Sequence, residues 1–204
     1  MSNELWWYTA RAAGIVGWAL LAASVLWGLF ISTKALGGRA RPNWVLDLHR
    51  FLGGFAVIFT AVHVLGIMMD NYIHFGLSEV VVPFTGSWNP NAVAAGIVGM
   101  YLLIAVEVSS LLRRRIPRRA WRAIHFASFP LFFASTLHAF MAGTDSGGVA
   151  FTSVAIAISL AIVALTVRRV NQARRQAPPM FASRIPPTAA AHPIDDPGLV
   201  SAGR

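Results

Sequence analysis

Long apolar stretches, each able to cross a lipid bilayer as a helix, recur along the chain of 204 residues. A membrane-spanning helix needs about 20 mostly apolar residues. Runs of this kind occupy approximately residues 5–31, 45–69, 92–112, 121–141 and 149–167. Charged residues make up only 12% of the chain, against about 25% in a soluble domain. The sequence therefore predicts an all-α membrane protein, a bundle of five transmembrane helices within residues 1–168.

Basic residues alternate sharply between the loops. The loop 33–43, the run RRRIPRRA at 113–120 and the C-terminal segment are rich in Lys and Arg, whereas the loops 70–91 and 142–148 contain none. Because positive charge favours the cytoplasmic side, we expect an extracytoplasmic N-terminus and a cytoplasmic C-terminus. The net charge of +9 is then a signal of topology in a lipid-embedded protein, and no nucleic-acid partner is expected. A multi-pass protein of a bacterial cell membrane is the predicted localisation.

The C-terminal segment 169–204 is rich in Pro, Ala and Arg, which is typical of a disordered tail on the cytoplasmic side. This segment is too short for a flavin or nicotinamide domain, and no G-x-G-x-x-G motif occurs in the chain. There is no cysteine, which excludes disulfides, thiolate ligands and iron–sulfur clusters.

Four of the six histidines lie inside predicted spans, two in the second span and two in the fourth. The predicted topology places His49 and His125 near the cytoplasmic face and His63 and His138 near the outer face. Fourteen residues separate His49 from His63, a rise of about 21 Å that returns to within about 40° of the same helix face. The thirteen residues from His125 to His138 miss by about 140° on an ideal helix. We expect Pro130 to kink and rewind that helix.

Each pair of histidines would offer two opposed nitrogen ligands at one depth of the membrane. The simplest occupant of such a site is a haem iron held between facing helices. Gly53, Gly54 and Gly66 on the second span would let a flat macrocycle approach the backbone. Zinc is less favoured, because zinc sites usually have three or four protein ligands. Core histidines that bond only to their neighbours are the remaining alternative.

Three stretches carry a resemblance to a known family: ARAAGIVGWALL in the first span, LHRFLGG…VH in the second and WRAIHF…TLHAF in the fourth. Over approximately residues 5–167 the chain resembles the ferric reductase-like transmembrane domain. That family includes the membrane part of NADPH oxidases and the haem subunit of periplasmic methionine sulfoxide reductase. The resemblance implies two haem b groups, one ligated by His49 with His125 and one by His63 with His138. It also implies transmembrane electron transfer of an oxidoreductase type.

The chain departs from its relatives in ways that bear on its partners. The oxidases and eukaryotic reductases fuse a flavin module and carry an additional N-terminal span, and the methionine sulfoxide reductase subunit lacks a counterpart of His49. We therefore expect a separate donor, such as a flavin reductase, a ferredoxin-like protein or quinol. The extracytoplasmic acceptor would be ferric iron, oxygen or a redox protein. The alternatives are a non-catalytic electron-relay subunit and a haem-free scaffold or transporter.

A few further polar residues lie in or beside the spans. Arg11, which matches an arginine near the outer haem of the oxidases, is expected either to pair with a haem propionate or to reach the outer interface. Glu107 is expected to pair with a cytoplasmic arginine or to be protonated. Asp145 has the setting of a turn residue. His74 and Asp70 could line an acceptor site, although a solvated loop histidine is the simpler interpretation.

Overall fold

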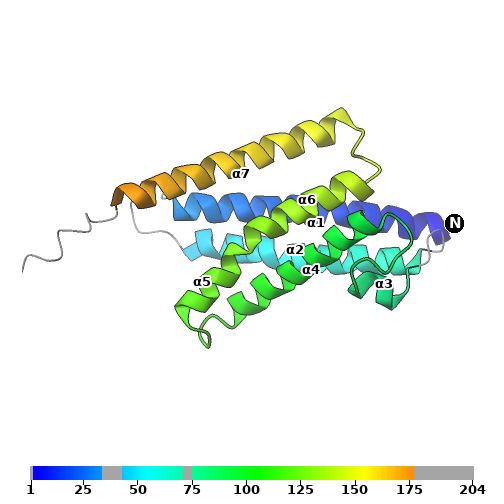
Figure 1. The fold of residues 1–204 in the computed structure, drawn as a ribbon, viewed down its shortest axis with the longest axis horizontal. Helices are drawn as coiled ribbons and strands as arrows, with labels where there is room; N and C mark the ends of the chain where they lie inside the picture. Colours follow the sequence, from blue (N-terminus) through cyan, green and yellow to red (C-terminus); the bar gives the residue numbers. More distant parts are fainter. Residues whose placement is uncertain (1, 34–42, 71–74, 177–204) are drawn as a thin grey trace, which may run out of the picture. The chain divides into compact units, whose positions relative to one another are not determined.

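The computed structural model describes residues 2–33, 43–70 and 75–176, and within these ranges all regular structure is helical. Five helical segments are long and apolar enough to cross a membrane, which confirms the prediction of five spans (Figure 1). They are α1 (Ser2–Ser32), α2 (Asn43–Met69), α4 (Pro90–Leu111), α5 (Arg118–Phe126) continued by α6 (Ser128–Ala142), and α7 (Val149–Gln176).

A short helix, α3 (Leu77–Val81), lies in the long loop between α2 and α4 and was not predicted. Its first turn is held by a hydrogen bond from the Gly76 N–H to the Glu79 carboxylate, 2.8 Å long. The Tyr101 hydroxyl on α4 donates to the carbonyl of Val81 at the other end. The bond from Tyr101 attaches the loop to α4. His74 falls outside the described residues.

Close helix–helix contacts bring the histidine-bearing helices beside glycine-containing partners. Helix α1 packs along α2, and α4 packs along α6. A Cβ atom added to Gly66 of α2 would lie 3.0 Å from the Cβ of Ala10 on α1, so the two backbones approach closely there. A core of buried apolar side chains joins α1 to α6, with Trp18 donating a 3.0 Å hydrogen bond to Thr136. The bundle thus fixes α2 and α6 through their packing against α1 and α4.

The fourth span is interrupted at Ala127, three residues before Pro130. Proline has no N–H to bond to the carbonyl of Phe126, and its ring would clash with that carbonyl in a continuous helix. Just before this point the Ala127 N–H bonds to the carbonyl of Ile124, three residues earlier, at 2.9 Å. A regular α-helix would use the carbonyl four residues earlier, so the helix is locally tighter here. Pro130 then lies in the first turn of α6, where a missing N–H is tolerated. Pro130 was expected to kink and rewind this helix, and the structure has a break at Ala127 that divides the span into α5 and α6.

Helix α7 continues to Gln176, beyond the predicted end of the fifth span at residue 167. The compact bundle ends at Arg169, and residues 169–176, which were expected in a disordered tail, are helical. Arginine is a good helix former, and Arg174 and Arg175 in the last turn interact favourably with the negative end of the helix dipole. The prediction for the rest of the tail lies outside the described residues.

Candidate functional site

Two pairs of histidine rings face each other between α2 and the α5–α6 segment. We call His49 with His125 the inner pair and His63 with His138 the outer pair, after the predicted topology. The ring centroids are 6.0 Å apart in the inner pair and 6.1 Å apart in the outer pair. The planes meet at 77° and 81°. The histidines of α2 are fourteen residues apart and those of α5 and α6 are thirteen apart, yet the rings meet in two pairs. The break before Pro130 lies between the two histidines of the second segment.

Three of the four rings are oriented by main-chain carbonyls of the neighbouring helix. The Nδ1 atom of His63 lies 2.7 Å from the Ala10 oxygen, and that of His138 lies 2.8 Å from the Ala92 oxygen. The Nδ1 atom of His49 is 3.1 Å from the Ser24 oxygen. A carbonyl can only accept, so Nδ1 carries the hydrogen and the Nε2 lone pair is left available. Histidines that ligate metals are typically held in this manner.

A glycine stands beside each of these three rings and gives it room. A Cβ added to Gly96 would lie 2.7 Å from His138 Nδ1, and one added to Gly14 would lie 2.8 Å from His63 Nδ1. At Gly28 the nearest atom would be the Cε1 of His49, at 3.2 Å. Each glycine follows the accepting residue by four positions, in ARAAG, SVLWG and AVAAG. Because residue i+4 lies over the carbonyl of residue i in a helix, the missing side chain opens that oxygen to the imidazole.

These glycines were missed by the sequence analysis, which singled out those on α2. Gly53 instead faces the carboxyl group of Glu107, and Gly66 faces α1, whereas an added Cβ at Gly54 would meet nothing within 4 Å. The signal that could have identified the right positions is on α1. There the pattern of a small residue followed four positions later by glycine occurs at Ala10 and again fourteen residues on, which matches the histidine step on α2.

The outer pair lies beside a cavity of about 450 Å³ bounded by α1, α2, α4 and α6 and by the loops at that end of the bundle. Its walls are mainly apolar, with Trp7, Trp18 and Trp88 among them. Its few charged groups are Arg11, Asp70, Glu79 and Asp145. Ligand pockets are typically about 300–1,000 Å³, mostly apolar and supplied with a few polar groups. The cavity therefore has the size and lining of a binding site for an apolar group that carries a few charges.

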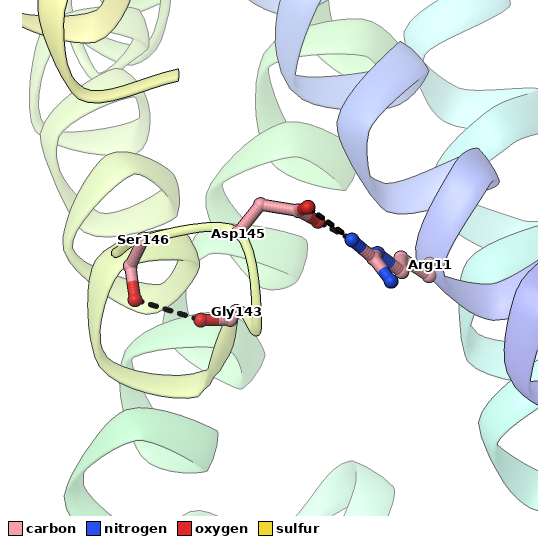
Figure 2. Close-up of polar contacts among 4 residues, drawn as sticks. All are labelled: Arg11, Gly143, Asp145 and Ser146. Atoms are coloured by element: carbon pink, nitrogen blue, oxygen red, sulfur yellow. Dashed lines mark hydrogen bonds and ion pairs between the residues drawn. The ribbon is translucent and has the colours of Figure 1, made fainter. Parts of the chain in front are cut away.

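Arg11 and Asp145 form a bidentate ion pair at this cavity (Figure 2). The Arg11 Nε donates to Oδ2 of Asp145 at 2.7 Å, and Nη2 donates to Oδ1. Asp145 also belongs to a turn, as expected, because its carbonyl accepts from the Gly148 N–H at 2.9 Å. The pair was not predicted. It uses two of the five guanidinium N–H donors, so Arg11 keeps donors for a further partner.

We expect Asp145→Asn to weaken the fold at neutral pH but not at strongly acidic pH. The hydrogen bond from Arg11 lowers the pKa of the Asp145 carboxyl below its ordinary value, and the charge of Arg11 acts in the same direction. A depressed pKa means that the pair stabilises the fold above about pH 4 and that this contribution is lost as the pH falls through the lowered pKa. Thermal unfolding of the purified protein in detergent between pH 8 and pH 3 measures this difference.

Asp47→Asn is the matched control, since Asp47 pairs with Arg50 at 3.2 Å and both side chains are more than half exposed. Exposed pairs of this kind contribute little, so its unfolding curve should follow the wild type at every pH. Equal melting temperatures for wild type and Asp145→Asn at pH 7 would contradict the assignment.

The inner pair differs from the outer pair at His125. The indole of Trp121 stacks on this imidazole, with centroids 5.0 Å apart and planes at 20°. The Nδ1 of His125 is buried and has no hydrogen-bond partner in the described part of the chain. Glu107 was expected to pair with a cytoplasmic arginine or to be protonated, and it forms no ion pair with any residue that the structure describes.

Among the residues that the structure describes, neither pair is part of a larger ligand cluster. Within the described ranges, no group of three or more His, Asp or Glu side chains could hold a metal ion. Each pair therefore brings two imidazole rings together without a third side chain that could ligate a metal ion in the described ranges. Such an arrangement suits an ion whose remaining ligands come with a cofactor.

Comparison with known proteins places the chain in a family. The model of the ferric reductase like transmembrane component matches residues 13–136, more than half of the chain, and includes His49, His63 and His125. His138 lies two residues beyond the matched segment. Searches of curated proteins and of solved structures gave no match. This integral, multi-pass membrane protein belongs to the family of ferric reductase-like transmembrane components, which indicates a role in transmembrane electron transfer.

Proposed function

We propose that the protein is a di-haem b cytochrome that carries electrons across the membrane. In this proposal the inner pair ligates one haem iron and the outer pair ligates the other. The bound haems would supply one-electron redox chemistry, and the protein would supply ligation, orientation and tuning.

The separation of the rings carries the proposal. Two metal–imidazole bonds of about 2 Å in line would put the two ligating nitrogens about 4 Å apart. The distance from nitrogen to ring centre adds roughly 1 Å at each end, given ring bonds of about 1.3–1.4 Å. The expected centroid distance is therefore about 6 Å, and the observed values are 6.0 and 6.1 Å. A direct hydrogen bond between two imidazoles, at about 3 Å between nitrogens, would give roughly 5 Å.

The surroundings of the rings support the same conclusion. The carbonyl bonds at Nδ1 of His49, His63 and His138 leave Nε2 free to bind iron. The cavity beside the outer pair is apolar enough for a macrocycle, and Arg11 at its edge suits a propionate. The fourteen-residue step on α2 places His49 and His63 roughly 21 Å apart along that helix, so the two pairs would hold separate haem groups.

The distribution of charge supports a direction for the proposed transfer. The arginine-rich end of the bundle would be cytoplasmic, and the outer pair would then lie near the extracytoplasmic face. With the inside negative, outward movement of an electron is favoured by about 2.3 kcal/mol per 100 mV. A separate donor (a flavin reductase, a ferredoxin-like protein or quinol) would reduce the inner haem. The acceptor outside would be ferric iron, oxygen or a redox protein.

Purified protein tests the proposal directly. We expect two haem b per chain by pyridine haemochrome assay and the spectrum of low-spin, bis-histidine haem. Proteoliposomes that contain a trapped reductant should then reduce an impermeant ferric chelate outside. Haem-free protein of normal stability would refute the proposal and favour a scaffold or transporter. Haem reduction without reduction of the chelate would identify a relay subunit that needs a partner enzyme.

A further inference from the structure

His125 is the exception to the way in which the other three histidines are held. His49, His63 and His138 each bond through Nδ1 to a main-chain carbonyl exposed by a glycine four residues later. The Nδ1 of His125 is buried and lacks a partner among the residues that the structure describes. A buried donor left without a hydrogen bond destabilises the fold, so a partner for this atom is expected nearby.

The register of α4 identifies the position from which a partner would come. On α1 the two glycines that expose a carbonyl to a histidine, Gly14 and Gly28, are fourteen residues apart. On α4 the same step leads from Gly96, which faces His138, to Ser110. Helix α4 also packs against α5, which carries His125. Serine thus stands where the pattern on α1 has glycine.

Helices α4 and α5 carry buried polar atoms without a hydrogen-bond partner in the described ranges, and these include both an acceptor and donors. The Ser110 hydroxyl oxygen and the Trp121 Nε1 are buried and, like His125 Nδ1, have no hydrogen-bond partner in the described ranges. The Trp121 ring stacks on His125, so the two N–H groups belong to one small region of α5. A hydroxyl offers two acceptor lone pairs, whereas an indole N–H and an imidazole Nδ1–H can only donate. Ser110 therefore supplies the type of atom that the two rings lack.

We propose that Ser110 is a positioning residue for the inner site, whose hydroxyl accepts the Nδ1 hydrogen of His125 through one buried water. The inference rests on the proposed haem ligation by His125. In this arrangement a side-chain hydroxyl replaces the main-chain carbonyl that orients the other three ligands. The bond fixes the Nδ1–H tautomer, directs Nε2 to the iron and raises the basicity of the ligand.

Ser110→Ala tests the inference through the redox potential of the inner haem. Loss of the acceptor makes the imidazole a weaker donor to ferric iron, so the potential should rise. We expect a threefold to tenfold change in the reduction equilibrium, where tenfold corresponds to 59 mV for one electron. Potentiometric titration of both haems measures the shift, and the haem that disappears in His49→Ala identifies the inner one. The potential of the outer haem should not move.

Two further variants serve as controls. Ser110→Thr keeps the hydroxyl and should retain the wild-type potential. Ser109→Ala removes the adjacent buried hydroxyl, which already bonds to the Val106 carbonyl at 3.0 Å, and should leave both haems unchanged. Loss of the inner haem in Ser110→Ala, but not in Ser109→Ala, would support the inference as well, since an outer-sphere partner can change metal affinity by 10–100-fold.

Failure of the proposed haem binding and failure of the proposed role of Ser110 would give different results. Wild-type protein without haem would overturn the proposed function itself. Two haems in the wild type, with an unshifted inner potential in Ser110→Ala, would overturn only the role of Ser110. An equal effect in Ser109→Ala would count against it too, because that result indicates general repacking of the end of α4.

Discussion

His63→Ala and His138→Ala should each yield a protein with one haem per chain instead of two. Each variant leaves a single imidazole at the outer site, and iron would lose one of its two protein ligands. Changes to an outer-sphere partner alone cost about 10–100-fold in metal affinity, so removal of the ligand itself should cost more. Electron transfer across proteoliposomes should fall more than about 100-fold, because the path would lack its outer carrier. Haemochrome assay and reduction of an external ferric chelate measure the two effects.

His192→Ala is the control, since His192 lies far along the C-terminal segment and is assigned no role. It should keep two haems and the wild-type rate. His49→Ala gives the complementary result, in which the outer haem remains and the inner haem is lost. Full haem content in His63→Ala and His138→Ala would show that the facing rings are not the ligands.

Gly96→Ala and Gly14→Ala should damage the outer site although neither residue would touch iron. The added methyl groups would lie 2.7 Å and 2.8 Å from the Nδ1 atoms of His138 and His63. The rings must then move away from the carbonyls that hold them. Overpacking of this kind costs about 1–3 kcal/mol of stability. Loss of the orienting bond should lower haem affinity by about 10–100-fold, measured as retention of the outer haem in competition with apomyoglobin.

The same helices provide matched controls with the opposite sign. A Cβ at Gly99 would have its nearest contact at 3.8 Å, and one at Gly17 at 3.5 Å, both ordinary van der Waals distances. Gly17 and Gly99 also line the cavity, so this comparison is made on the thermal stability of haem-free protein. Alanine is favoured over glycine in a helix by about 1 kcal/mol, so Gly99→Ala and Gly17→Ala should leave that stability unchanged or raise it. If all four variants changed the stability of the protein to the same extent, Gly14 and Gly96 would not have the proposed role of giving the imidazole access to the carbonyl.

The sequence predicted the features that depend on length and periodicity. Spans of about 20 apolar residues were identified because the bilayer sets their length. The facing of His49 with His125 and of His63 with His138 agrees with their predicted depths, since the helices that carry them run in the same direction. The interruption near Pro130 follows from the missing N–H of proline. Each of these inferences uses information within one helix or at one depth.

The features that were missed depend on how one helix lies against another. Whether the carbonyls of Ala10 and Ser24 meet His63 and His49 depends on the sliding position of α1 along α2, which the periodicity of neither helix contains. The Arg11–Asp145 pair joins residues 134 positions apart, through a loop whose course the sequence does not specify. Helix α3 is held to α4 by a hydrogen bond from Tyr101, and its five residues are too few to produce a periodic signal.

His49, His63 and His138 are each held by a main-chain carbonyl beside a glycine, and this arrangement makes some positions of the site more tolerant of mutation than others. The acceptor atoms belong to the peptide backbone, which is present whatever side chain occupies positions 10, 24 and 92. Substitution there changes the packing but cannot delete the acceptor. At positions 14, 28 and 96, by contrast, almost any replacement adds bulk against a ring. During divergence such a protein would therefore keep the orientation of these histidines while most of α1 and α4 changed, provided that the three glycines were retained.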